Sequence, residues 1–196
     1  MTRAYQLKRR AAAQEETRHR IVQAAVALHQ ERGPALTSFT DIAARAGVGR
    51  MTVYRHFPDE QALFTACSGA YFEQHPLPDV AGLAPTADPA ARLRAALRAA
   101  YDYHRETEPM MVRVLAQVGD EPVTRPYHEH WQAAADRLAE AAAAGDPRRR
   151  ATVRAAVLLA LSFQTRQLLV RKGGLTDEEA AEVASRFVLA AAAPAA

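Results

Sequence analysis

The segment at residues 39–57, FTDIAARAGVGRMTVYRHF, constrains the fold more than any other part of the chain. In a helix-turn-helix, the first helix needs a small residue where the second crosses it, and the turn needs a residue that tolerates positive φ. The second helix must bury one side. Ala43, Gly47 and Val53 occupy these three positions, at spacings of four and six residues. The two predicted helices run over 39–46, where Ser38 can cap the first turn, and from about 48 to 56.

The second of these helices has a polar outer surface. With Val53 and Phe57 turned inward, its other side chains face outward on the element that a helix-turn-helix lays in the DNA major groove. Arginine donates to guanine edges or phosphates, and hydroxyl or imidazole groups hydrogen-bond to phosphates. A small bundle with a solvated third helix is the alternative, but it would not need the small residue, the turn glycine and a Tyr-His pair together. The outward residues are Arg50, Met51, Thr52, Tyr54, Arg55 and His56.

The charge of the chain is unevenly distributed. The net charge is only +3, but residues 1–60 hold ten Lys and Arg against six Asp and Glu, whereas the rest holds fifteen against sixteen. The basic excess therefore lies in the N-terminal third, which suits a polyanion such as DNA. A solvated basic tail would account for the charge alone equally well.

The remaining sequence predicts an all-α chain of two domains. Apolar residues at spacings of three and four indicate further helices, and four prolines without periodicity mark residues 75–89 as a loop. Strand signals are absent. The predicted helices outside the turn motif run over 15–32, 59–74, 89–105, 109–118, 126–143, 149–171 and 177–192. The predicted organisation is a basic, flexible arm at 1–14, a three-helix helix-turn-helix domain at 15–74, a linker at 75–88 and a helical domain at 89–196.

Residues 15–74 resemble the DNA-binding domain of the tetracycline-repressor (TetR) family of bacterial transcriptional regulators. The match runs through LTSFTDIAARAGVGRMTVYRHFPDEQALF, and its specific parts are Ile42-Ala43, Ala46-Gly47-Val48, Thr52-Val53-Tyr54 and His56-Phe57. The resemblance implies that Ser38 and Thr40 lie near the DNA and that Thr52, Tyr54 and His56 hold phosphates. It also implies that Arg50 and Met51 reach the bases.

One position departs from the family pattern. The fourth helix of the family usually opens with a lysine that meets a phosphate, whereas here FPDEQ supplies Asp59 and Glu60. Carboxylates suit a helix N-terminus but repel DNA. Lys8, Arg9 and Arg10 can compensate from an arm ahead of the first helix, and an unordered tail is the alternative.

The last two predicted helices suggest a homodimer. The stretch at 153–170 is apolar over most of its circumference, and a helix of that kind must bury more than one side. The resemblance implies dimerisation through a four-helix bundle that the last two helices of each subunit form. A fully internal helix in a monomeric core is the alternative. The residues expected at the interface are Leu161, Val183 and Phe187.

The middle helices predict a mostly apolar ligand site. An all-helical core with aromatic, His and Gln side chains among many alanines offers both space and scattered hydrogen-bonding groups. Core packing is the alternative for each residue, and Arg113 would favour an anionic group only if it points inward. The candidate ligand-binding residues are Tyr101, His104, Met111, Arg113, Trp131, Phe163 and Gln164.

The sequence predicts neither an enzyme nor a metal or cofactor site. His128 and His130 diverge by roughly 200° on a helix, and no HExxH, phosphate-binding glycine loop or nucleophile elbow occurs. Cys67 fits a small apolar filler. No apolar run reaches the roughly 20 residues of a membrane span and no secretory signal precedes the helices, so a cytoplasmic protein without a membrane partner is expected.

These features together predict a sequence-specific regulator, a repressor that a small, largely apolar effector releases from a palindromic operator. A helical ligand-binding or scaffolding protein without specific DNA readout is the alternative.

Overall fold

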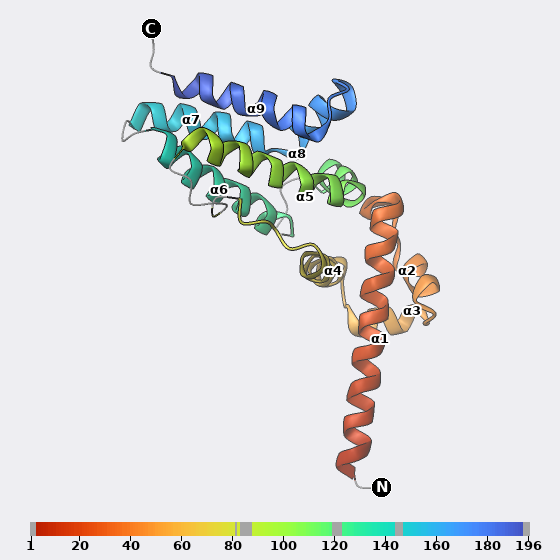
Figure 1. Ribbon diagram of the computed structural model, residues 1–196. Helices are drawn as coiled ribbons and strands as arrows, with labels where there is room; N and C mark the ends of the chain where they lie inside the picture. The colour runs from red at the N-terminus through yellow and green to blue at the C-terminus, as the bar shows by residue number, and fades with distance from the viewer. Residues whose placement is uncertain (1–2, 81, 83–87, 119–122, 144–146, 194–196) are drawn as a thin grey trace. The chain divides into compact units, whose positions relative to one another are not determined.

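The computed structural model describes residues 3–80, 82, 88–118, 123–143 and 147–193 (Figure 1). These residues form helices joined by turns and contain no strand, as the all-α prediction requires. The chain divides into two compact units. The first unit comprises Met1–Pro76 and Pro109–Thr124, and the second comprises Leu77–Glu108 and Arg125–Ala196.

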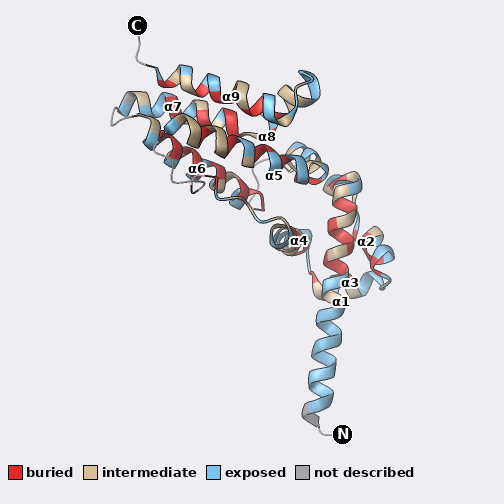
Figure 2. Cartoon of the chain, viewed as in Figure 1, coloured by how far each residue is buried: buried red, intermediate tan, exposed pale blue. Residues whose placement is uncertain are grey.

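The first unit contains α1 (Arg3–Arg32), a 3₁₀ turn (Pro34–Leu36), α2 (Phe39–Ala46), α3 (Arg50–His56) and α4 (Glu60–Gln74). Its core is the apolar stripe of α1 packed against the inner sides of the three following helices, shown red in Figure 2. The buried residues that make this core include Ile21, Ala25, Leu28, Ile42, Val53, Phe57, Leu63 and Cys67.

The first helix differs from the prediction at its start. Helix α1 begins at Arg3. The described residues of the segment 1–14, which was expected to be a flexible arm, are therefore part of this helix. Ala11, Ala12 and Ala13, with Lys, Arg and Gln around them, are strong helix formers. The buried residues from Ile21 onward fix the later turns of α1. Once a helix is nucleated in this way, extending it through strong helix formers costs little free energy.

The first unit also includes 109–124, which the sequence analysis placed in the C-terminal domain. One interaction that holds this segment is made by the side chain of Gln117, whose Oε1 accepts a hydrogen bond from the backbone N–H of Ala35 at 3.0 Å. Gly33, with φ 88°, lies directly beneath the Gln117 amide, and a Cβ at this position would meet the amide at 2.5 Å. A glycine therefore permits this close approach.

The second unit is built from the first part of α5 (Pro89–Gln117), α6 (Arg125–Ala143), α7 (Pro147–Leu161), α8 (Phe163–Arg166), a π-helical turn (Gln167–Lys172) and α9 (Asp177–Ala192). Helix α7 packs against both α6 and α9, and the buried sides of these three helices face one another (Figures 1 and 2). The bounds of α9 are those that the sequence predicted, and Thr176 and Glu179 form a capping box at its start.

The sequence analysis predicted one helix break that is absent and missed another that is present. Pro109 was expected to separate two helices, but α5 continues through it. The proline removes one hydrogen bond at a cost of about 3 kcal/mol, and buried residues on both sides, Thr107, Met110 and Met111, oppose a break. Conversely, the helix predicted over 149–171 is interrupted at Ser162, which has extended backbone and caps α8 through Thr165 N–H.

No single helix among the described residues is long and apolar enough to cross a membrane. Residues Arg149–Leu161 and Phe163–Lys172 reach the required length and apolarity only when counted together across a 59° bend.

Candidate nucleic-acid interface

The turn between α2 and α3 has the geometry that the sequence predicted. Gly47 adopts φ 66° and ψ 39°, a left-handed conformation, and its N–H donates to the carbonyls of Ala43 and Ala44. At the other end of α2, Ser38 and Asp41 form a reciprocal capping box: Asp41 N–H donates to Ser38 Oγ, and Ser38 N–H donates to Asp41 Oδ2 at 3.0 Å. The two caps confine α2 to a defined length and hold the turn ahead of α3.

Helix α3 is anchored by its inner side and exposed on the other. Val53 and Phe57 are 0% and 1% exposed. The guanidinium of Arg18, on α1, lies over the Phe57 ring at 4.9 Å, so α1 holds the end of α3. The predicted DNA-facing residues all lie away from this core: Ser38, Thr40, Arg50, Met51, Tyr54 and Arg55 are exposed, and Thr52 and His56 are half-buried.

Three side chains form a stack on this exposed surface. Arg50 Nη2 donates to the Tyr54 hydroxyl at 3.1 Å, and the guanidinium also lies 5.4 Å from the centre of the Tyr54 ring. Tyr54 in turn packs against Phe39, with ring centres 4.9 Å apart. Phe39 is buried at the start of α2 and was not singled out from the sequence, although an aromatic residue directly after a cap was available as a signal. The stack holds Arg50 in an outward position before any DNA is bound.

The capping box occupies the hydroxyl of Ser38. Ser38 Oγ donates to Asp41 Oδ2 at 2.6 Å, and Arg32 pairs with the same carboxylate oxygen at 3.0 Å. The hydrogen bonds from Ser38 hold the pKa of Asp41 below its ordinary value, so this carboxylate is ionised at neutral pH. The Ser38 side chain therefore already has a structural role, which leaves Thr40 as the free hydroxyl at this end of α2.

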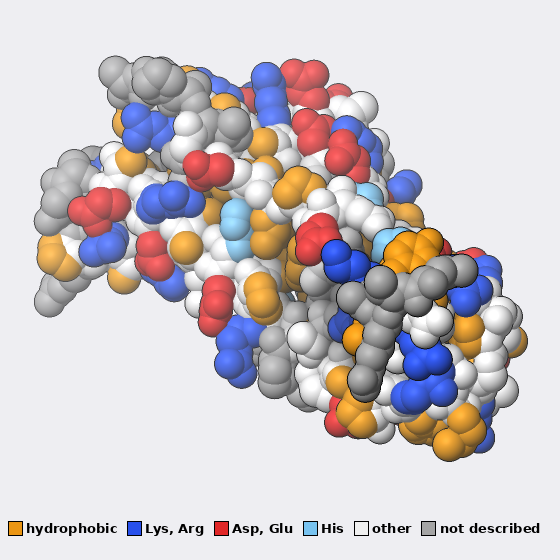
Figure 3. All heavy atoms as spheres, turned by 90° about the horizontal axis from the view of Figure 1, so that it is seen from below, with side chains coloured by type: hydrophobic (Ala, Val, Ile, Leu, Met, Phe, Trp, Pro, Cys, Tyr) orange, Lys and Arg blue, Asp and Glu red, His pale blue; other side chains and the backbone are white. Residues whose placement is uncertain are grey.

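The start of α4 carries carboxylates where the family usually has a lysine. Asp59 accepts from Ala62 N–H at 2.7 Å and caps the helix, and Glu60 follows it in the first turn. Both residues stabilise the helix N-terminus. Among the described residues, the first unit therefore offers positive charge to DNA from α1 and α3 rather than from this end of α4. Figure 3 shows Lys and Arg side chains, in blue, gathered on the part of the first unit that holds the N-terminal end of α1.

Comparison with known proteins agrees with this geometry. The family model described as bacterial regulatory proteins, tetR family, matches residues 21–67. Residues 21–67 are therefore similar to that family of bacterial regulators. The matched residues include α2, the Gly47 turn and the whole of α3.

Individual relatives are similar over part of the chain or in fold. The HTH-type transcriptional repressor Rv3405c of Mycobacterium tuberculosis is 50% identical over 52 residues, which are 26% of this chain and only 28% of that protein. A TetR-family regulator from Streptomyces coelicolor aligns with a TM-score of 0.63 at 22% identity, over 90% of this chain and 79% of that one. A TetR-like regulator from Rhodococcus sp. RHA1 gives 0.59 at 19% identity, over 88% and 93%. At such identities the structural likeness shows the fold alone.

The second unit brings together four of the seven predicted ligand residues. His104 is the centre of an aromatic cluster: Trp131, Phe163 and Tyr101 have ring centres 4.9, 5.7 and 6.5 Å from it. All four residues are buried. The rings of Tyr103 and Tyr127 also lie around His104, with ring centres 5.9 and 6.4 Å from it. Neither tyrosine was among the seven predicted ligand residues.

The other three predicted ligand residues lie elsewhere. Gln164 is exposed, because the helix break at Ser162 turns it away from the interior. Met111 is buried and Arg113 is half-buried, but both belong to the first unit, beyond Pro109. The Arg113 guanidinium donates to the carbonyl of Pro109 at 3.4 Å. These three residues therefore do not belong to the cluster around His104, and their part in a ligand site stays a prediction.

His104 has one buried nitrogen that its surroundings do not use. Its Nε2 lies 2.9 Å from the carbonyl of Leu161, which can only accept, so this nitrogen carries the proton. Burial lowers the pKa of His104 to about 4, and the imidazole is neutral at pH 7. Nδ1 is then a buried acceptor with no partner among the described residues. Tyr101, by contrast, is satisfied, since its hydroxyl donates to the carbonyl of Ala160 at 3.0 Å.

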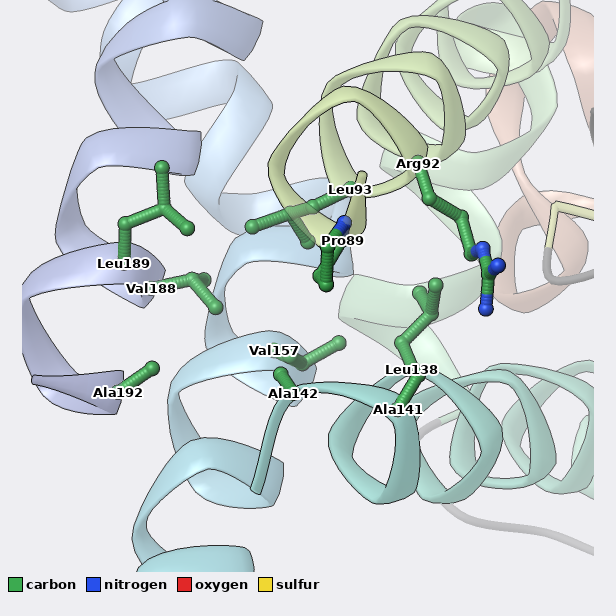
Figure 4. Close-up of a pocket in the computed structure, with 10 residues that line it drawn as sticks. All are labelled: Pro89, Arg92, Leu93, Leu138, Ala141, Ala142, Val157, Val188, Leu189 and Ala192. Carbon is green, nitrogen blue, oxygen red and sulfur yellow. The ribbon is translucent and has the colours of Figure 1, made fainter. Parts of the chain in front are cut away.

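The second unit also has a small crevice between α5, α6, α7 and α9 (Figure 4). Leu93, Leu138, Val157 and Val188 project into it, and its volume is about 20 Å³. That volume holds roughly one water molecule. The crevice is apolar but too small for an effector in this conformation.

The predicted dimer residues do not share one environment. Leu161 is 0% exposed and packs inside its own subunit, where its carbonyl faces His104, so its expected place at an interface was wrong. Phe187 is 66% exposed on α9, and Val183 is half-buried one turn before it. Leu159, on α7, is also 66% exposed. It lies two positions from Leu161 and therefore on another side of the helix.

Proposed function

We propose that this protein is a homodimeric repressor that reads a two-fold symmetric operator through α3 and is released by a small, largely apolar effector. The observation that carries the proposal is the outward, pre-organised stack of Arg50 on Tyr54 and Phe39, on a helix whose other side is buried. Arginine held in this way is suited to a bidentate contact with guanine. A merely solvated helix would gain nothing from such an arrangement.

Removing the Arg50 side chain tests the readout. Arg50→Ala is expected to weaken operator binding by about 1–3 kcal/mol and to relax the preference at one base position in each half-site. Tyr54→Phe keeps the stacked ring but loses the hydroxyl, so it should weaken binding to all sequences alike. The measurement is fluorescence anisotropy with the chain's own upstream DNA and single-base variants of it, at a stated salt concentration.

The matched control is Arg45→Ala, which removes an exposed arginine of α2 that pairs with Glu31 instead of facing outward from α3. It should leave the base preference unchanged. Because Arg50 and Tyr54 share a hydrogen bond, the double variant should lose less than the sum of the two single losses. If Arg50→Ala and Tyr54→Phe weaken all sequences equally, α3 does not read bases through Arg50.

The homodimer rests on an apolar stripe at the surface of the second unit. Helices α7 and α9 pack against each other, and each exposes apolar residues at helical spacing. Exposed apolar residues at such spacing are typical of an interaction site. If two subunits associate here about a two-fold axis, the dimer presents two copies of α3 to DNA. The exposed or half-buried stripe residues are Ala151, Ala155 and Leu159 on α7, and Val183, Phe187 and Ala190 on α9.

The effector site rests on the cluster around His104. A buried acceptor without a partner costs about 1–3 kcal/mol, and a ligand that donates to His104 Nδ1 would recover that energy. The rings of Trp131, Phe163 and Tyr127 would surround the rest of such a ligand. These features favour an aromatic or alicyclic molecule with one hydroxyl or N–H donor. Binding must widen the core, because the rings around His104 already pack against it, with ring centres 4.9 to 6.5 Å away.

A comparison of phenols with their methyl ethers tests this site. The ether has nearly the same shape but cannot donate a hydrogen bond. A phenol that raises the melting temperature is expected to lower operator affinity 5- to 150-fold, which corresponds to a coupling of about 1–3 kcal/mol. The matched ether should act about tenfold more weakly, in line with the loss of one hydrogen bond.

Thermal shift and DNA release are measured in parallel, on the wild type and on Trp131→Ala at a temperature where both are folded. Equal action on both proteins would place the site elsewhere. Absence of any compound that releases DNA would count against an inducer of this class.

A further inference from the structure

Residues 77–80, at the start of the second unit, are not helical and yet are held against α6 (Figure 1). Non-helical segments usually run over the surface, because a buried segment must find partners for all its backbone polar groups. Val80 departs from this pattern, since it is 0% exposed. We call residues 77–80 the strap.

Two side chains of α6 hold the strap. His130 Nε2 donates to the carbonyl of Pro78 at 3.0 Å. Arg137 Nη2 donates to Oδ1 of Asp79 at 3.2 Å. The same carboxylate oxygen accepts from the N–H of Gly82 at 3.1 Å, which fixes the direction of the chain where it leaves the strap.

The two anchors define the side of α6 that the strap covers. His130 and Arg137 are seven residues apart, about two helical turns, so they lie on one side of the helix. Ala134 lies between them on that side and is 0% exposed. Tyr127, three residues before His130, lies only about 60° further round the helix.

This side of α6 adjoins the aromatic cluster of the proposed effector site. The Tyr127 ring lies 6.4 Å from that of His104. The His130 ring, which holds the strap, lies 4.9 Å from the ring of Trp131, and Trp131 is in turn 4.9 Å from His104. The strap is therefore part of the covering that separates this cluster from solvent.

The strap is held by few interactions. The Arg137–Asp79 pair is 57% and 68% exposed, so it adds little to stability. Val80 is the only one of the four strap residues that is buried. Segments with few buried contacts open locally far more often than a whole unit unfolds. Lifting the strap also breaks no hydrogen bond within a helix, so α6 can stay packed while the strap leaves it.

We infer that the strap is a gate for the effector site, which lifts from α6 to let an effector reach the cluster and closes again behind it. His104 and Trp131 are 0% and 6% exposed, so a compound cannot reach them while every covering element stays in place. This inference rests on the proposed effector site, to which it adds a route of entry. The strap controls how fast an effector binds and leaves.

A buried thiol measures the opening of the strap. The full chain first receives Cys67→Ala, which removes its single natural cysteine. Ala134→Cys then places a thiol under the strap. As the matched control, Ala135→Cys places a thiol about 100° further round α6, at a residue that is also 0% exposed. When reclosing is fast, the rate of reaction with methyl methanethiosulfonate under native conditions follows the population of the open form.

Val80→Ala is expected to speed the reaction at position 134 roughly tenfold, because it removes two buried methyl groups that stabilise only the closed form. Arg137→Gln removes one surface anchor without making a cavity, and should speed the reaction up to about fivefold. Neither change should affect position 135. Arg154→Gln breaks a comparable exposed pair, with Asp136, and should change neither rate. Circular dichroism checks that each variant is folded.

No acceleration at position 134, or equal acceleration at both positions, would overturn the inference, because the second result means that the whole unit loosens. Its link to the effector is tested with a phenol that raises the melting temperature. The association rate, followed by the fluorescence of the single tryptophan, Trp131, should rise roughly tenfold in Val80→Ala. An unchanged association rate would mean that the compound enters elsewhere, which also overturns the gate. If no phenol binds either protein, the proposed effector class fails, and the thiol rates still decide whether the strap opens.

Discussion

Replacing Arg166 by methionine is expected to lower the free energy of unfolding by about 3–5 kcal/mol, the usual cost of breaking a buried ion pair by removing one partner. Arg166 is 1% exposed and is the largest fully buried side chain among the described residues. Its Nε donates to Asp177 at 2.6 Å and its Nη1 donates to Glu108 at 3.0 Å. Methionine fills much of the same volume but leaves both carboxylates without their central cation.

The matched control is Arg171→Met. Arg171 bonds the same carboxylate, with Nε and Nη2 each 2.8 Å from an oxygen of Glu108, but its side chain is 62% exposed. An exposed pair of this kind is worth about 0–1 kcal/mol. Urea denaturation at pH 7 measures both variants. If Arg166→Met costs no more than Arg171→Met, the buried network does not stabilise the second unit in the way its geometry indicates.

A third variant identifies the origin of the loss. Adding Glu108→Gln and Asp177→Asn to Arg166→Met removes the two carboxylates as charges while keeping their size. Because neutral replacement of a whole buried network is often close to neutral in stability, this triple variant should recover most of the loss. A triple variant as unstable as Arg166→Met would mean that lost packing, and not uncompensated charge, causes the effect.

Glutamates at Leu159 and Phe187 together are expected to give a monomer whose operator affinity is about 10²- to 10⁴-fold lower. The proposed dimer binds its second half-site as an intramolecular event, and loss of that linkage removes an advantage of this size. Both side chains are 66% exposed, so a charge placed there can remain in water in the monomer. In the dimer it would be buried without a partner. Sedimentation velocity gives the mass, and anisotropy gives the affinity.

Leu168→Glu is the control for this variant. Leu168 is 57% exposed on the π-helical turn and lies off the stripe of α7 and α9. It should change neither mass nor affinity. If the double variant remains a dimer with the wild-type affinity, the subunits associate through another surface. If it is a monomer that binds DNA as tightly as before, the two-fold operator is not required.

The sequence by itself determined the DNA-binding end of the protein. The helix-turn-helix depends on contacts between residues close together in the chain: Ser38 caps α2 through Asp41, Gly47 takes the left-handed conformation, and Val53 lies six residues beyond it on the buried side. Because these local preferences agree with one another, residues far away in the chain have little influence on this motif. The bounds of α9 were also predicted correctly, from its apolar spacing within the helix.

Only the tertiary structure decided the features that depend on distant partners. Pro109 stays inside a helix because of packing on both sides of it. The break at Ser162 follows a run whose apolar pattern predicted a continuous helix. Leu161 is buried because α5 brings His104 to its carbonyl, and Arg166 is buried because carboxylates 58 residues earlier and 11 residues later reach it. A lone arginine in an apolar run signals that such partners must exist, but helical periodicity says only which side of a helix a residue occupies. Which element covers that side is settled by the packing of the whole unit.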